Sequence, residues 1–146
     1  NLYQRENFIC SVINRISKNG DSLENIKIAV WGLTFKPETD DMRNAPSIDI
    51  LNSLLSKGAI VHATDPRASK ESVAKVFQHD NFQFIDNQYD IVKNADCLLL
   101  LTEWREFRSP DFNKIKSLIK APIIFDGRNL YNKFELEDLG FELHQI

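Results

Sequence analysis

The sequence is poor in the residues that build metal centres and disulfide frameworks. It has two cysteines, Cys10 and Cys97, without a CxxC pair, and three scattered histidines. No pair of these histidines has the spacing of metal ligands. We therefore expect no metal site. Because both cysteines lie in apolar stretches, we expect buried, reduced thiols.

Long hydrophobic runs and an excess of basic charge are also missing. No stretch approaches the roughly 20 apolar residues that a membrane-spanning helix requires. The formal net charge is -3, whereas a general nucleic-acid surface needs clustered lysine and arginine. These absences predict a cytoplasmic protein with neither a membrane nor a nucleic acid as its partner.

Glycine is scarce where a dinucleotide-binding fold would need it. The turn after the first apolar run holds Gly32 but no GxGxxG pattern, so the phosphate cradle of that fingerprint is missing. Asp65 follows the second apolar run, where such a fold has its ribose-binding acid. Without the cradle, an independent NAD-binding module is disfavoured. We interpret Asp65 as the cap of a helix beginning near Ala68.

The chain does contain a regular alternation of short apolar runs and amphipathic stretches. The runs predict strands at 26–31, 60–64, 82–85, 97–101, 123–125 and 141–144, and the stretches predict helices near 46–57, 68–77, 88–93, 111–119 and 133–138. Strand followed by helix, repeated, predicts an α/β fold with a doubly wound, mostly parallel six-stranded sheet of the Rossmann-like kind. Ligands of such sheets bind at the carboxyl ends of the strands.

An amphipathic helix over about residues 4–18 precedes this pattern, with apolar side chains at Phe8, Ile9, Val12, Ile13 and Ile16. Since the chain begins with Asn1 inside a helical pattern, we expect it to be part of a longer protein. Residues 1–20 then form a linker helix and 21–146 the domain proper. We expect the helix to pack on the sheet with one edge of its stripe and to offer the other edge to a partner.

The loop after the first strand is the most informative segment. Residues 32–47 are more than a strand-to-helix connection needs, and they include Phe35, Lys36 and Arg43. Spacing alone favours a solvated Lys36 beside a packed Phe35, and it leaves open an Arg43 paired with a nearby aspartate. In a ligand-binding loop, the same side chains would face a phosphorylated compound.

Two later loops carry polar residues to the same edge of the predicted sheet. After the fifth strand, Arg128 is either a plain surface residue or a bidentate phosphate ligand. Its neighbour Asp126 is better explained as a cap, or as a partner that orients Arg128, than as a general acid. After the fourth strand, we expect Glu103 to organise the loop and Trp104 to pack against it.

These three loops resemble, in order and spacing, the C-terminal UDP-binding domain of the UDP-glucose/GDP-mannose dehydrogenase family, which includes the UDP-glucose 6-dehydrogenases. The resemblance covers about residue 20 to the end. It implies that Phe35, Lys36 and Arg128 contact the UDP-sugar. It also implies that Arg43 faces NAD, which is bound mainly by an N-terminal domain outside this chain.

The resemblance further implies a parent protein with N-terminal and central domains, which forms a homodimer. The parent would oxidise UDP-glucose to UDP-glucuronate with two NAD, as a step in polysaccharide biosynthesis. Neither cysteine of this chain matches the family's nucleophile motif, so the chain is expected to contain no catalytic residue.

Alternatives stay open. The same domain serves dehydrogenases of UDP-N-acetylmannosamine and GDP-mannose. A receiver-like signalling domain is also a doubly wound sheet of this size, with acids after its first strand and a threonine after its fourth, here Thr102. It is disfavoured because a receiver needs a lysine after the fifth strand, where this chain has Asp126, Gly127 and Arg128.

Overall fold

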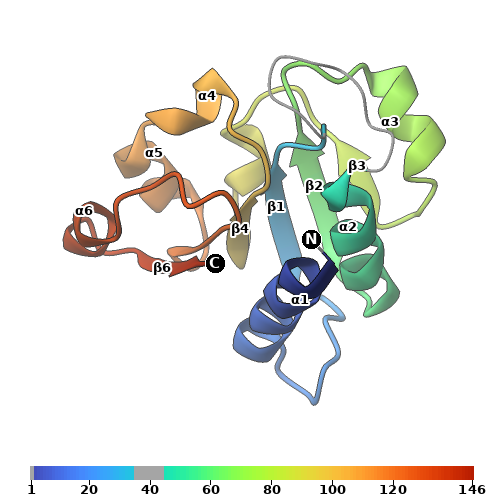
Figure 1. Cartoon of the computed structure of the whole chain (residues 1–146), viewed down its shortest axis with the longest axis horizontal. Coiled ribbons are helices and arrows are strands. Elements are labelled where there is room, and N and C mark those ends of the chain that lie inside the picture. The colour runs from blue at the N-terminus through green and yellow to red at the C-terminus, as the bar shows by residue number, and fades with distance from the viewer. Residues whose placement is uncertain (1, 35–44) are drawn as a thin grey trace.

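The computed structural model describes residues 2–34 and 45–146, and these form a single six-stranded sheet with helices on both faces (Figure 1). The strands are β1 (Lys27–Trp31), β2 (Ile60–Thr64), β3 (Phe82–Phe84), β4 (Cys97–Leu100), β5 (Ile123–Asp126) and β6 (Glu142–Gln145). Their order is β3-β2-β1-β4-β5-β6, and every neighbouring pair is parallel. The predicted α/β fold is confirmed.

The helices are α1 (Leu2–Ile16), α2 (Pro46–Ser56), α3 (Lys70–Val76), the 3-10 turn η1 (Asp90–Val92), α4 (Arg105–Arg108), α5 (Phe112–Leu118) and α6 (Lys133–Asp138). None of those found in residues 2–34 and 45–146 has the length and apolar character needed to cross a bilayer. The region predicted as a helix near 88–93 is only the single turn η1. The short α4 was not predicted, because four residues are too few to show a helical period.

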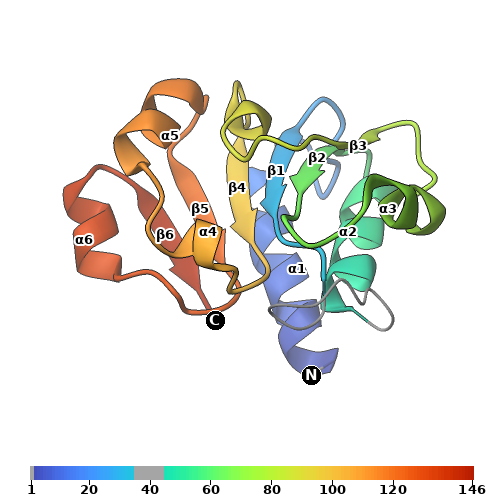
Figure 2. The same cartoon turned by 90° about the horizontal axis from the view of Figure 1, so that it is seen from above.

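The sheet separates two hydrophobic cores, because successive side chains of a strand point to opposite faces. On β1, Ile28 and Val30 belong to the core beneath α1, α2 and α3, whereas Ala29 and Trp31 belong to the core beneath η1, α4, α5 and α6. Figure 2 shows the two groups of helices on either side of the strands. Strands buried on both faces explain why the apolar runs in the sequence are continuous rather than alternating.

Helix α1 is part of the first core. Phe8, Val12 and Ile16 are buried in it, and Ile9 and Ile13 pack against it partly buried. The helix lies beside α2 (Figure 1) and is tied to it by an ion pair of Arg5 Nη1 with Asp49 Oδ2 at 2.6 Å. Most of the apolar face of α1 therefore packs in the core of the sheet, and within this face Ile9 and Ile13 keep some exposure.

The two cysteines differ in their surroundings. Cys97 on β4 is fully buried, and burial raises the pKa of its thiol. Cys10, by contrast, lies on the exposed side of α1. The expectation that Cys10 is buried was wrong, because the residue falls between the apolar positions of the helix and so faces away from the sheet.

The far end of α1 is joined to β6 by a second ion pair. Arg15 donates from Nε and Nη2 to the two carboxylate oxygens of Glu142, at 2.6 and 2.9 Å, and His144 Nε2 lies 2.6 Å from Glu142 Oε2. The hydrogen bonds from Arg15 lower the pKa of Glu142 to about 2.

A carboxyl group whose pKa is lower in the folded than in the unfolded chain stabilises the fold above its unfolded pKa and stops doing so as pH falls. We expect Arg15→Gln to lower the free energy of unfolding at neutral pH by less than about 1 kcal/mol, since the pair is half-exposed. The deficit should shrink as pH falls from about 4.5 towards 2. Thermal unfolding across this range is the measurement, and Lys18→Gln, at an exposed position just beyond α1, is the control. A deficit that does not change with pH would contradict the assignment.

Candidate functional site

The loops that follow β1, β2, β4 and β5 meet at the carboxyl edge of the sheet. The central strand β1 pairs with β2 on one side and β4 on the other, so the connections that follow β1 and β4 lead to opposite sides of the sheet. Such a switch in strand order opens a crevice where ligands of doubly wound sheets bind. This edge is therefore the candidate site.

A buried carboxylate, Asp65, holds three of these loops together. Its Oδ2 accepts hydrogen bonds from the backbone N–H of Leu33 at 2.7 Å and of Thr34 at 3.0 Å, and from the indole Nε1 of Trp104 at 2.9 Å. Its Oδ1 accepts from the backbone N–H of Arg67 at 2.8 Å. Asp65 thus joins the loop after β2 to those after β1 and β4.

These bonds correct the interpretation of Asp65. The helix that follows begins at Lys70, and its cap is Ser69, whose hydroxyl accepts from the N–H of Ser72 at 3.1 Å. Asp65 caps the turn after β1 instead. The sequence signal for this role was an aspartate at the end of a buried strand, but its partners Leu33, Thr34 and Trp104 lie more than 30 residues away in the sequence.

The same bonds explain why the turn after β1 is unlike a dinucleotide cradle. In such a cradle, backbone N–H groups at the helix start face a phosphate. Here those of Leu33 and Thr34 donate to Asp65, and that of Gly32 donates to the carbonyl of Thr64 at 2.9 Å. The missing glycine pattern therefore has a structural counterpart, since these donors are already used inside the protein.

The segment after β4 contacts a different loop with each of three successive residues. Thr102 packs against Gly32, which has a φ of +103°, and a Cβ there would collide with the threonine side chain. Glu103 reaches the loop after β5, and Trp104 reaches Asp65. The expected roles of Glu103 and Trp104 as organising and packing residues agree with these contacts.

Arg128 is held at both its backbone and its side chain. Asp126 is fully buried, and its Oδ1 accepts from the Arg128 N–H at 3.0 Å, while its Oδ2 accepts from the N–H of Tyr131 at 2.8 Å. The guanidinium of Arg128 donates from Nε and Nη2 to Glu103 Oε1, with the Nε bond at 3.0 Å. Asp126 therefore shapes the turn that presents Arg128, as expected, and all its bonds are those of an acceptor.

Three predicted site residues, Phe35, Lys36 and Arg43, lie outside the described residues. The structure does describe the residues on either side of them. Thr34 is fixed by Asp65, and the hydroxyl of Ser47 donates to the carbonyl of Leu33 at 2.6 Å. The beginning and the end of the 32–47 loop are thus anchored at the edge that carries Arg128.

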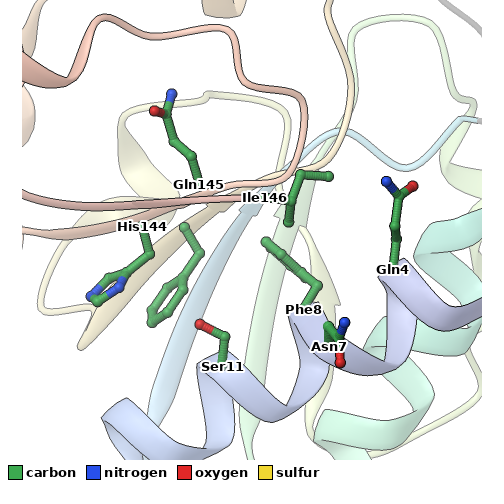
Figure 3. A pocket seen from close by; sticks show the side chains of 8 residues that line it. Gln4, Asn7, Phe8, Ser11, His144, Gln145 and Ile146 are labelled. Carbon is green, nitrogen blue, oxygen red and sulfur yellow. The ribbon is translucent and has the colours of Figure 1, made fainter.

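A pocket of about 220 Å³ lies beside this edge, between α1 and the ends of β5 and β6. Figure 3 shows Phe8 and Ser11 of α1 on one side of the pocket and His144 of β6 on the other, while the side chain of Gln145 points away from α1. The ring of Phe8 also lies against Gly127. A Cβ built on this glycine would be 3.4 Å from Cε1 of Phe8, which is van der Waals contact. Helix α1 therefore forms a wall next to the Arg128 loop.

We expect Asp65→Asn to destabilise the fold by about 2 to 3 kcal/mol, because an amide cannot accept at both positions and would leave a buried N–H or indole without its charged partner. Denaturant unfolding measures this loss. Asp86→Asn, at an exposed aspartate after the neighbouring strand β3, is the matched control and should change stability by less than about 0.5 kcal/mol. Equal effects of the two substitutions would contradict the role given to Asp65.

Comparison with known proteins agrees with this geometry. Residues 29–133 match the model of the UDP-glucose/GDP-mannose dehydrogenase family, UDP binding domain. Among curated relatives, UDP-glucose 6-dehydrogenase of Pseudomonas aeruginosa is 44% identical over 78% of the chain, and that of Rickettsia bellii is 40% identical over 86%. The chain spans only 26% and 29% of their lengths.

Solved structures show the same fold. An NDP-N-acetyl-D-galactosaminuronic acid dehydrogenase from Methanosarcina mazei matches 99% of the chain and 28% of its own length, with a TM-score of 0.77 and 26% identity. A UDP-glucose dehydrogenase from Pyrobaculum islandicum matches 92% of the chain and 28% of its own length, with a TM-score of 0.73; its 23% identity speaks for the fold alone. The chain therefore belongs to the UDP-glucose/GDP-mannose dehydrogenase family, and it contains the UDP-binding domain of that family.

Proposed function

We propose that this chain is the C-terminal, substrate-binding part of a UDP-glucose 6-dehydrogenase, and that Phe35, Lys36 and Arg128 bind the UDP-sugar. The observation that carries the proposal is Arg128, a cation held at the ligand edge of a UDP-binding domain by Asp126 and Glu103. A guanidinium suits a diphosphate because its paired N–H groups match two phosphate oxygens. The names of the relatives at 40% and 44% identity favour UDP-glucose over other nucleotide sugars.

The reaction itself is assigned to the rest of the longer protein. Oxidation of UDP-glucose to UDP-glucuronate removes two hydrides, one for each of two NAD, and proceeds through a thiol of the enzyme. Cys97 does not suit that role, since it is buried and its thiol pKa is raised, whereas a nucleophile must be an accessible thiolate. We propose that the N-terminal and central domains supply the nucleophile and that this chain supplies substrate binding.

The same division applies to the cofactor. The turn after β1 does not fit the pyrophosphate of NAD, because its N–H groups donate to Asp65 and to the backbone. We propose that NAD is held mainly by the N-terminal domain and that Arg43 reaches it from this chain. We further propose that residues 1–20 lead in from a central domain through which the parent forms a homodimer.

In the full-length protein, we expect Arg128→Ala and Lys36→Ala each to raise the KM for UDP-glucose about 10- to 100-fold. Each removes a charge-assisted contact worth roughly 1.5 to 3 kcal/mol. Steady-state kinetics at saturating NAD measures the change. Lys133→Ala, at an exposed lysine in the first turn of α6, is the control for loss of positive charge and should leave KM unchanged. Unchanged saturation curves for both site variants would rule out the assignment.

We also expect Arg43→Ala in the full-length protein to raise the KM for NAD more than the KM for UDP-glucose, because this residue is assigned to the cofactor side of the site. The reverse ratio is expected for Arg128→Ala, which makes the two variants internal controls for each other. Measurement of both constants for both variants gives the comparison. An effect of Arg43→Ala on UDP-glucose alone would move Arg43 to the sugar site.

A further inference from the structure

We propose that Glu103 is a positioning residue for the substrate diphosphate, which aims one edge of the Arg128 guanidinium at the ligand. This inference rests on the proposed function, since it assumes that Arg128 meets the diphosphate. It assigns to Glu103 a part in substrate binding without contact to the substrate.

A guanidinium has two edges that can each hold an anion through two parallel N–H groups. One edge is formed by Nε and Nη2, and the other by Nη1 and Nη2. Glu103 uses the first edge, because its Oε1 accepts from both Nε and Nη2 of Arg128. The second edge points away from Glu103 and has the spacing of two phosphate oxygens. A diphosphate can therefore bind Arg128 without displacing the carboxylate.

The main chain of both residues is held by further hydrogen bonds. The backbone of Arg128 is held by Asp126, and the backbone carbonyl of Glu103 accepts from Nε of Arg108 at 3.2 Å. On either side of Glu103, Thr102 and Trp104 are buried, so the carboxylate extends from a rigid segment. The side chains themselves are only partly exposed, at 43% for Arg128 and 32% for Glu103.

Stability alone does not account for the pair. An ion pair at this exposure contributes little to folding, because water screens the charges and two long side chains lose freedom. The restricted side chain of Arg128 nevertheless favours ligand binding. An arginine already held in one rotamer need not be ordered again on binding, which raises the affinity for the ligand. The pair is thus better explained by preorganisation than by stabilisation of the fold.

The test uses the full-length protein, with UDP as the probe in calorimetric titration and UDP-glucose in steady-state kinetics. Glu103→Gln keeps the shape of the side chain and removes its charge. We expect it to raise the Kd for UDP and the KM for UDP-glucose about three- to tenfold, with kcat and the melting temperature nearly unchanged. Glu106→Gln is the matched control, since it removes a carboxylate 3.6 Å from Arg67 on the same edge and should alter neither constant.

The decisive measurement is the double variant. If Glu103 acts through Arg128, Glu103→Gln has no further effect on the Kd for UDP once Arg128 is alanine, because the group it positions is gone. The same loss in both backgrounds would overturn the proposal in favour of a general structural role. Tighter binding of UDP by Glu103→Gln would overturn it differently, by showing that the carboxylate competes with the diphosphate. Failure of the proposed function is distinguishable, since Arg128→Ala by itself would then leave UDP binding intact.

Discussion

The buried carboxylate of Asp65 is the interaction on which the ligand edge depends. Burying an anion is unfavourable unless hydrogen-bond donors surround it. Here the donors come from the separate loops that follow β1, β2 and β4. The second buried carboxylate, Asp126, does the same for the turn after β5 and for β6, whose Gln145 donates to it at 3.0 Å. Both groups accept from neutral donors, which are backbone N–H groups, the Trp104 indole, the Thr34 hydroxyl and the Gln145 amide. Among the residues that the structure describes, the hydrogen-bond donors given for these two carboxylates include no guanidinium or ammonium group, and Arg128 is left partly exposed at the edge.

This distribution of charge gives the site its character. In many doubly wound folds, the first turn binds phosphate through its backbone, whereas here a side chain of the protein has taken that place. Anion binding at this edge then has to come from side chains rather than from the backbone of this turn. Among the described carboxylates of this edge, Asp65 and Asp126 are buried and hydrogen-bonded, Glu103 is paired with Arg128, and Glu106 lies 3.6 Å from Arg67. The edge is in this way suited to an anionic ligand although the whole chain has a net charge of -3.

The sheet and the order of its elements could be predicted from the sequence. A strand buried on both faces appears there as a continuous apolar run, and an amphipathic helix appears as apolar residues at helical spacing. Contacts between loops leave no such pattern. Asp65 was read locally, as a cap of the next helix, although its partners Leu33 and Trp104 lie far along the chain in both directions. Cys10 was predicted from the apolar character of its helix, whereas its exposure depends on which side of that helix meets the sheet. Arg128 was found through its motif, but only the structure shows which of its edges is occupied.

The placement of α1 has a consequence for where this folding unit can be cut. The match to the family's UDP-binding domain begins at residue 29, after the helix has ended. Yet Phe8, Val12 and Ile16 fill the core beneath one face of the sheet, and Phe8 also lies against the turn that presents Arg128. An excised piece starting at residue 21 would expose this apolar face to water and leave Gly127 without its neighbour. The evolutionary boundary and the physical boundary of the domain are therefore different, and the physical one includes the helix.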